Sequence, residues 1–194
     1  MSALRKPDLQ GAKRYTYADY CTWDDDERWE LIDGAPYAMA APLILHQRIL
    51  SRIHVQIGSF LRKKTCEVFF APTDVRLNAD TGDDTVVQPD LLVVCDKSKI
   101  DDKGIIGAPD LVMEILSPSS VSHDMIKKYM LYLNANVREY WIVDPATGSV
   151  IVNILKDGSY NGKAYCSTAV VPVSVLAGCS VDLTEVFFGT EEET

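Results

Sequence analysis

Two acidic side chains lie in apolar segments of this chain, where a carboxylate needs a partner. Asp90 stands in the run Val-Val-Gln-Pro-Asp-Leu-Leu-Val-Val, and Glu114 stands in Leu-Val-Met-Glu-Ile-Leu. A buried carboxylate without a partner either costs free energy or shifts its pKa until it is neutral. Two carboxylates held together commonly share a cation, and Lys128 on the next segment adds an ammonium group that suits phosphate chemistry. The spacing therefore predicts a cation site that acts on a phosphate.

The two carboxylates also lie where their strands are interrupted. Pro89 cannot donate to a sheet ladder, and Ser-Pro follows the apolar run of Glu114. A hard cation such as Mg²⁺ takes one or two carboxylates, waters and substrate phosphate oxygens, which these positions would supply. The alternative is a structural pair satisfied by backbone amides or by Lys128. Lys128 is also spaced for a simple helical ion pair with Asp124.

The segments that position these residues follow from their hydrophobic periodicity. Thr16 is placed to cap a short helix, and Asp33-Gly34 is a favoured turn between two short strands. Apolar residues at helical spacing predict two longer helices, the second with Ile126, Tyr129, Met130 and Leu133 on its buried stripe. The expected helices cover about 43–64 and up to 135, and the expected strands cover 29–32, 36–40, 66–77, 85–94, 110–116, 139–143 and 149–155. Asn161-Gly162 is expected to be a further hairpin turn.

Composition limits the class of protein. A length of 194 residues is enough for one domain with a core, and a net charge of −9 argues against coating nucleic acid by bulk electrostatics. The five cysteines include no Cys-x-x-Cys pair, so we expect reduced thiols rather than a disulfide framework or a zinc ribbon. No apolar run approaches the length of a membrane span, and no signal peptide is evident. A cytoplasmic location, with no membrane partner and no organic cofactor, is the expectation.

Six motifs in order resemble those of one family. They are Glu-Leu-Ile-Asp-Gly at 30–34, His46, Gln-Pro-Asp at 88–90, Glu-Ile-Leu-Ser-Pro-Ser at 114–119, the spacing of Asp124, Lys128 and Tyr132, and Glu-Tyr-Trp-Ile-Val-Asp-Pro at 139–145. This set resembles the Uma-type restriction endonucleases, within the PD-(D/E)XK nuclease superfamily, over nearly the whole chain. The resemblance implies an α/β fold with a restriction-endonuclease-like mixed central sheet flanked by helices, an N-terminal hairpin and extra C-terminal strands. A single domain at 15–189 would lie between a flexible arm (1–14) and an acidic tail (190–194).

The resemblance also implies Mg²⁺-dependent phosphodiester hydrolysis, with Mn²⁺ as a possible substitute. Asp90 and Glu114 would hold the metal together with the backbone carbonyl of Ile115. The wider superfamily places its lysine two residues after the second acid, where this chain has Leu116. The Uma-type group takes its lysine from the following helix, which implies that Lys128 does this work. Glu30 matches a further family acid and would be a third carboxylate near the metal, or else an exposed strand residue.

Four other side chains are candidates for substrate contact. His46 would act as a base or phosphate contact, or else hydrogen-bond locally at the start of its helix. Arg48 and Arg52 would contact phosphates along a basic helix face, or else be solvated charges. Gln88 would hold a water or the Asp90 carboxylate, or else support the structure.

The leading hypothesis is a metal-dependent endonuclease acting on DNA, with RNA also allowed by the residues. A homodimer would suit a duplex substrate because a two-fold interface mirrors the symmetry of the duplex. The alternative is a catalytically silent nucleic-acid-binding or protein-interaction module on the same fold, which Leu116 and the −9 charge favour. A carboxylate hydrolase acting on sugars would need two opposed carboxyl groups across a cleft, and the intervening lysine argues against it.

Overall fold

The computed structural model describes residues 6–9, 13–117 and 123–190, and the side chains of 123–125 are not part of this description. Most of the expected arm (1–14) and of the expected tail (190–194) therefore lies outside the described residues. Within these ranges no helix combines the length and the apolar character that crossing a membrane requires.

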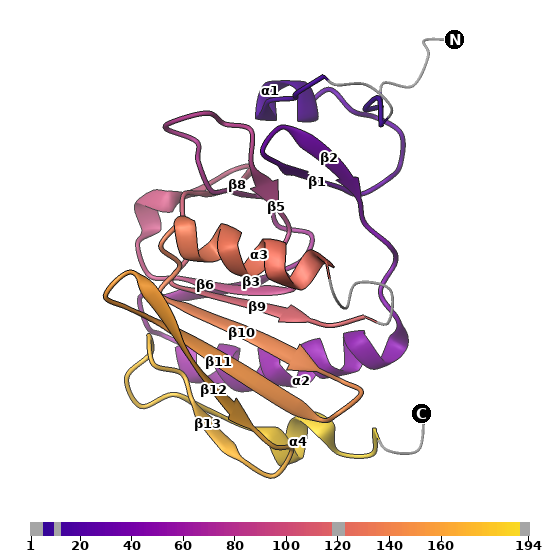
Figure 1. Cartoon of the computed structure of the whole chain (residues 1–194). Coiled ribbons are helices and arrows are strands. Elements are labelled where there is room, and N and C mark those ends of the chain that lie inside the picture. Colours follow the sequence, from indigo (N-terminus) through magenta and orange to yellow (C-terminus); the bar gives the residue numbers. More distant parts are fainter. Residues whose placement is uncertain (1–5, 10–12, 118–122, 191–194) are drawn as a thin grey trace.

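The central sheet has six strands in the order β12-β11-β10-β9-β6-β3. β10 runs parallel to β9, whereas the other neighbouring pairs are antiparallel. Helix α2 covers one face of this sheet and helix α3 covers the other (Figure 1). The bounds are β3 Glu67–Phe70, β6 Leu91–Val94, β9 Leu111–Ile115, β10 Glu139–Asp144, β11 Ser149–Lys156, β12 Ser159–Tyr165, α2 Ile44–Leu61 and α3 His123–Asn134.

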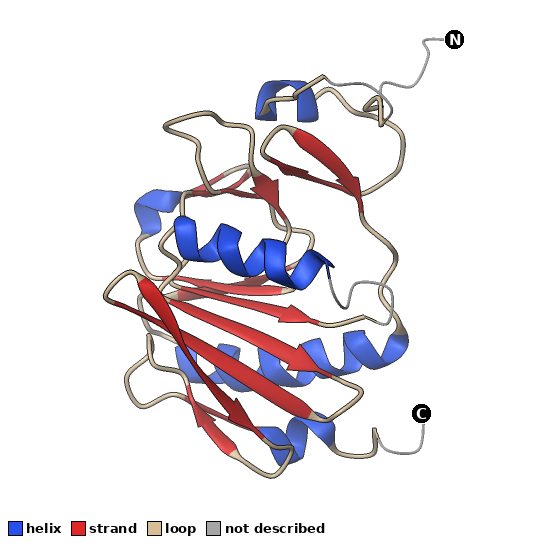
Figure 2. Cartoon of the chain, viewed as in Figure 1, coloured by secondary structure: helices blue, strands red, loops and turns tan. Residues whose placement is uncertain are grey.

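A second six-stranded sheet lies beyond α3, so that this helix is placed between two sheets (Figure 2). Its order is β2-β1-β5-β4-β8-β7, with bounds β1 Trp29–Ile32, β2 Ala35–Ala38, β4 Val75–Arg76, β5 Val86–Val87, β7 Ile100–Asp101 and β8 Gly104–Ile106. The remaining elements are α1 Tyr17–Tyr20, the 3-10 helix η1 Lys97–Lys99, β13 Val170–Pro172, β14 Ser180–Asp182 and α4 Leu183–Phe187. The mixed α/β architecture with helices on both faces of the central sheet confirms the expected fold class.

The alternation of side chains along the strands divides the core into two clusters and determines on which face of the sheet Glu114 lies. Side chains two residues apart on a strand share a face. On β9, Leu111, Met113 and Ile115 pack into the cluster on the α2 side. Val112, on the opposite face, packs with Tyr132 of α3 and with residues of the second sheet. Glu114 lies on the same face of β9 as Val112. A carboxylate therefore occupies a position where strand alternation would set an apolar core side chain.

Several local predictions are confirmed. Thr16 caps α1 through a capping box: its hydroxyl accepts from the Asp19 amide, and the Asp19 carboxylate accepts from the Thr16 amide. The Asp33-Gly34 turn joins β1 to β2, with Gly34 at φ +74°. These features depend on short-range hydrogen bonds and turn conformations, which a local sequence pattern specifies.

Three boundaries differ from the prediction. The expected strand 66–77 is divided into β3 and β4 around a cis Ala71–Pro72 bond, and 85–94 is divided into β5 and β6 at the Gln88-Pro89-Asp90 interruption. In both cases the chain passes from one sheet to the other. Asn161-Gly162 lies inside β12 rather than in a turn, because Asp157 and Gly158 make the hairpin turn with positive φ angles.

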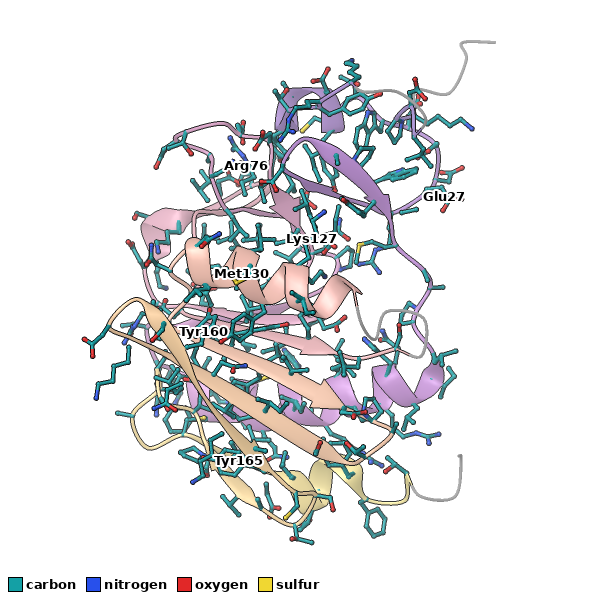
Figure 3. All side chains as sticks on the ribbon, in the orientation of Figure 1. Glu27, Arg76, Lys127, Met130, Tyr160 and Tyr165 are labelled. Atoms are coloured by element: carbon teal, nitrogen blue, oxygen red, sulfur yellow. A yellow bond between two sulfur atoms is a disulfide. The ribbon has the colours of Figure 1, made fainter. Side chains whose placement is uncertain are left out.

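The predicted buried stripe of α3 is wrong for Ile126 and Met130, whereas Tyr129 packs against the core as predicted. Ile126 is 68% exposed and Met130 is 46% exposed, whereas Tyr132 is fully buried. The inward face carries Lys128 and Tyr132, one helical turn apart. This face turns inward because Lys128 finds carboxylate partners there, which apolar periodicity does not reveal. Figure 3 shows Met130 and the neighbouring Lys127 on this helix.

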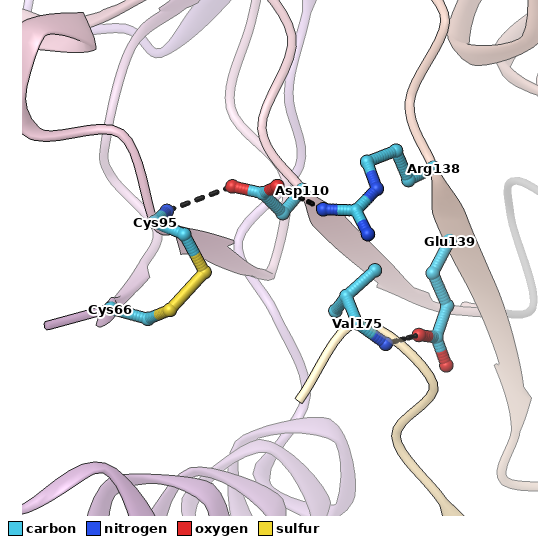
Figure 4. The surroundings of a disulfide bond; sticks show 6 residues. All are labelled: Cys66, Cys95, Asp110, Arg138, Glu139 and Val175. Atoms are coloured by element: carbon cyan, nitrogen blue, oxygen red, sulfur yellow. Dashed lines mark hydrogen bonds and ion pairs between the residues drawn. A yellow bond between two sulfur atoms is a disulfide. The ribbon is translucent and has the colours of Figure 1, made fainter. Parts of the chain in front are cut away.

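The prediction of reduced thiols is wrong for two cysteines. Cys66 and Cys95 form a disulfide with their Cα atoms 3.9 Å apart (Figure 4). Cys21, Cys166 and Cys179 are free. β3 and β6 pair antiparallel with Glu67 opposite Val94, so the next register position sets Cys66 opposite Cys95. A sequence separation of 29 residues gave no sign of this cross-strand pairing.

Candidate active site

Asp90 and Glu114 meet because they lie at matching positions of neighbouring strands. β6 and β9 pair antiparallel with Leu91 opposite Met113, so the register continued by one residue sets Asp90 opposite Glu114. Opposed residues on one face have their Cβ atoms about 5 Å apart. The Asp90 carboxylate also accepts a hydrogen bond of 2.7 Å from the amide of Ile115, the residue that follows Glu114. The predicted carboxylate pair is therefore brought together.

Lys128 points at this pair rather than away from it. Its Nζ lies 3.0 Å from Oε1 of Glu114 and 3.0 Å from Oε1 of Glu30. The lysine side chain is 13% exposed, so the ammonium is largely desolvated. Glu30 is buried in β1 and accepts a further hydrogen bond from the Gln88 amide at 3.0 Å. The alternative of an exposed Glu30 beside Asp33 is excluded by this burial.

The cluster joins both sheets and both long helices. Glu30 belongs to the second sheet, Asp90 to the connection between the sheets, Glu114 to β9 and Lys128 to α3. The fifth member, His46, lies in the first turn of α2, and its Nε2 is 3.0 Å from Oδ2 of Asp90. His46 is therefore not bonded locally, since its partner lies 44 residues away.

Burial and charge set the ionisation of the cluster. Burial raises the pKa of Glu114 to about 7; Lys128 opposes this rise, and the charges of Asp90 and Glu30 add to it. Burial alone would lower the pKa of Lys128, but the carboxylates of Glu114 and Glu30 outweigh it and raise that pKa above its usual value. Lys128 is consequently a permanent cation, and Glu114 is the group of this pair that takes up a proton near neutral pH.

The carboxylate pair fits a hard cation that needs few protein ligands. No group of three or more His, Cys, Asp or Glu side chains forms a metal-binding cluster within the described ranges. Mg²⁺ nevertheless needs only one or two carboxylates when waters and phosphate oxygens complete its shell. The hydrogen bonds described here use Oδ2 of Asp90 and Oε1 of Glu114. Among the described residues, none of these bonds uses Oδ1 of Asp90 or Oε2 of Glu114, so these are the oxygens that could face a cation. Both side chains keep partial exposure, 16% and 12%.

Glu139 shows what a purely structural carboxylate looks like in this fold. It is fully buried and accepts from the Trp141 indole at 2.7 Å and from the Val175 amide at 2.8 Å. Figure 4 shows the bond to Val175. Each of its oxygens is satisfied by a neutral donor. Glu114 differs because its partners include a cation and a second acidic residue lies opposite it.

Three of the expected substrate contacts have other partners. The Gln88 side chain accepts from Arg28 and donates to Tyr20 and Asp74, so it supports the structure rather than the Asp90 carboxylate. Arg52 donates to the carbonyls of Val186 and Phe188, which ties the end of α4 to α2. Arg48 also has a partner in the structure. The side chain of Asp124 lies outside the described residues.

Tyr132 is the site residue that received no role from the sequence. Its hydroxyl donates to Oε1 of Glu114 at 2.6 Å, from the turn of α3 that follows Lys128. The signal was present in the four-residue spacing of Lys128 and Tyr132, which sets both on one helix face.

The central sheet has a helix on each face, and the cluster of carboxylates and Lys128 lies at the Gln88-Pro89-Asp90 interruption between β5 and β6. Together these features define a nuclease-like α/β protein. A solved structure described as "a putative nuclease belonging to DUF820 from Anabaena variabilis" has the same fold, with a TM-score of 0.72 and 21% identity over 89% of this chain and 97% of that chain. Residues 16–184 match the family Uma2, described as "Putative restriction endonuclease". The chain belongs to this family.

A sequence relative extends the comparison. An uncharacterized protein of Synechocystis is 30% identical over 128 residues, which is 64% of this chain. The matched region covers 66% of the length of that protein.

Proposed function

We propose that this protein is a metal-dependent endonuclease that hydrolyses phosphodiester bonds of DNA. The observation that carries the proposal is the position of Lys128, whose ammonium lies 3.0 Å from Glu114 while Asp90 stands at the opposing strand position. Two acids and one lysine thus converge although the lysine comes from a helix instead of the strand. Membership in a restriction endonuclease family supports the same chemistry.

The carboxylates of Asp90 and Glu114, with the Ile115 carbonyl, would hold Mg²⁺ or Mn²⁺. When bound, such a metal lowers the pKa of a water and polarises the scissile phosphate. Lys128 remains protonated, so it acts as a fixed positive charge that orients the attacking water and offsets charge on the pentacoordinate phosphate. It is not a general base in this arrangement.

Glu30 and His46 hold these groups in place. Glu30 shares the ammonium of Lys128 and is itself fixed by the Gln88 amide, so the lysine is held between two strands of different sheets. His46 and the Ile115 amide both contact Oδ2 of Asp90, which fixes the orientation of this carboxylate and would leave Oδ1 for the cation. The buried Nδ1 of His46 has no hydrogen-bond partner within the described structure, so the imidazole is held through its Nε2 contact with Asp90.

Nicking of supercoiled plasmid with Mg²⁺ or Mn²⁺ tests the proposal. We expect Asp90→Ala and Lys128→Met to lose at least about a hundredfold in rate, since removing one preorganised charge commonly costs this much. Lys127→Met is the matched control: Lys127 is the neighbouring lysine on α3, but its ammonium lies over the Tyr37 ring, away from the carboxylates. It should cut at the wild-type rate.

The same assay separates the proposal from its alternative, a catalytically silent binding module. That alternative is favoured by the ion pairs of Lys128, which satisfy Glu30 and Glu114 without any metal. A silent module would shift labelled DNA in a gel and leave the plasmid supercoiled with either metal. Activity that persists in Asp90→Ala would contradict the proposed mechanism, and cleavage of RNA in preference to DNA would revise the substrate.

A further inference from the structure

One oxygen of Glu114 takes two hydrogen bonds from α3. Oε1 accepts from Nζ of Lys128 at 3.0 Å and from the hydroxyl of Tyr132 at 2.6 Å. The two donors lie four residues apart, so they approach the same oxygen from successive turns of one helix face. An O–H···O⁻ bond of this length is charge-assisted and among the stronger hydrogen bonds in proteins.

A second tyrosine of the same core shows how a phenol is satisfied without a carboxylate. Tyr160 belongs to the same cluster, and its hydroxyl donates to the backbone carbonyl of Val137 at 2.9 Å, which is enough to satisfy a half-buried phenol. Tyr132 is fully buried and instead donates to a carboxylate that Lys128 already contacts. A second donor on the same oxygen adds little charge neutralisation, but it fixes the rotation of the carboxylate about its last bond.

We propose that Tyr132 is a positioning residue that locks Oε1 of Glu114 onto α3 and so presents Oε2 to the divalent cation. The inference rests on the proposed function, because the cation is the one that Asp90 and Glu114 would share. Without the hydroxyl, Lys128 alone holds Oε1, and the carboxylate rotates more freely about a single contact. Partners that orient metal ligands in this way typically affect metal affinity by ten- to a hundredfold.

Tyr132→Phe removes only the hydroxyl. The ring keeps its contact with Tyr140, whose centroid lies 5.0 Å away, so the core retains its volume. Tyr160→Phe is the matched control, since it also loses one hydroxyl donor in the same cluster but touches no carboxylate of the site. Thermal melts of both variants in chelator check that each one folds.

Calorimetric titration with Mn²⁺ alone, without DNA, is the first measurement. We expect the Kd of Tyr132→Phe to rise about tenfold or more over wild type, and that of Tyr160→Phe to stay within twofold. Asp90→Ala should abolish the binding, which locates it at this site. In plasmid nicking, Tyr132→Phe should need more Mg²⁺ for half-maximal rate and regain most of the rate at saturating Mg²⁺.

Each outcome bears on the positioning role separately from the nuclease activity. Equal Mn²⁺ affinity in wild type and Tyr132→Phe would overturn the role of Tyr132, even if both cut DNA. Absence of Mn²⁺ binding to wild type would overturn it as well. Weaker binding in Tyr132→Phe, combined with no cleavage by wild type, would support the positioning role and reject the proposed nuclease.

Discussion

Glu114 is the residue on which the chemistry of this site depends most directly. It replaces a core side chain on the face of β9 that packs against α3, and it stands opposite a second acid. Burial raises the pKa of Glu114 to about 7 even though Lys128 acts against the rise. The carboxyl group is therefore close to its ionisation midpoint at neutral pH. A bound divalent cation would favour the charged form and draw the proton away.

This ionisation makes the stability of the metal-free protein depend on pH. Because the pKa of Glu114 is raised from 4.5 to about 7, the folded state holds this proton more tightly than the unfolded state does. The contribution of Glu114 to the free energy of unfolding is therefore fully present below pH 4.5 and is lost as the pH rises through 7. Urea unfolding in chelator between pH 4.5 and 8 measures the loss.

Glu114→Gln supplies the control for this pH dependence. The amide keeps the shape of the side chain but does not titrate, so the fall in stability between pH 4.5 and 7 should be smaller than in wild type. Glu185→Gln, at an exposed position of α4, should leave the wild-type slope unchanged. Identical slopes in wild type and Glu114→Gln would show that another group causes the loss.

At the scale of the elements, the sequence predicted what short-range patterns specify. The hairpin at Asp33-Gly34, the capped helix after Thr16 and the length of α2 follow from turn, cap and periodicity rules. The approach of Asp90 to Glu114 was also predictable, since both acids interrupt neighbouring apolar strands. Here a polar residue within an apolar run was more informative than the apolar residues around it.

Long-range pairing accounts for what the sequence did not predict. The ion pair between Lys128 and Glu30 joins residues 98 positions apart, and the second sheet is assembled from strands of two to four residues. Such short strands carry no periodicity of their own. On α3, Ile126 and Met130 are exposed instead of buried, because Lys128 occupies the inward face with its ion partners.

The disulfide between β3 and β6 should contribute to stability at the edge of the central sheet. Closing a loop across 29 residues removes conformational freedom from the unfolded chain, which is worth about 3–4 kcal/mol in the loop-entropy model. We expect Cys95→Ser to lower the free energy of unfolding by about this amount under oxidising conditions. Equilibrium unfolding in urea, with and without dithiothreitol, measures the difference.

Adding dithiothreitol distinguishes the effect of losing the disulfide from the effect of replacing the Cys95 side chain. Wild type with dithiothreitol should approach the stability of Cys95→Ser, and the variant itself should not respond. Cys166→Ser, which changes an exposed free cysteine, should behave as wild type in both conditions. Wild type that is insensitive to the reductant under unfolding conditions would show that the bond contributes no stability.

For the whole molecule, the charge distribution limits how a polyanion is recognised. The chain carries a net charge of −9, and the cluster itself sets three acids against one lysine. Bulk attraction therefore does not bring DNA to this site, and neutralisation has to be local. A divalent cation between the acids and a phosphate supplies that neutralisation, which links the acidic surface to the proposed metal dependence.

The number of strands cut per encounter depends on how many copies act together. The described part of the chain holds one cluster of this kind, so under the proposed function a single copy would break one strand at a time. We expect a homodimer to act on duplex DNA, because a two-fold axis relates the two strands. Supercoiled plasmid should then become linear without accumulation of the nicked circle at concentrations where sedimentation detects a dimer.

Mixing active and inactive chains tests the dimer sharply. Asp90→Ala carries a disabled site, so a mixed dimer has one working cluster and leaves the opposite strand intact. Adding increasing amounts of Asp90→Ala to a fixed amount of wild type should therefore convert the linear product into nicked circle. Bovine serum albumin added at the same mass is the control and should leave the product pattern unchanged. If the copies act independently, the ratio of nicked to linear plasmid will not respond to the inactive chain, and the cutting unit is a monomer.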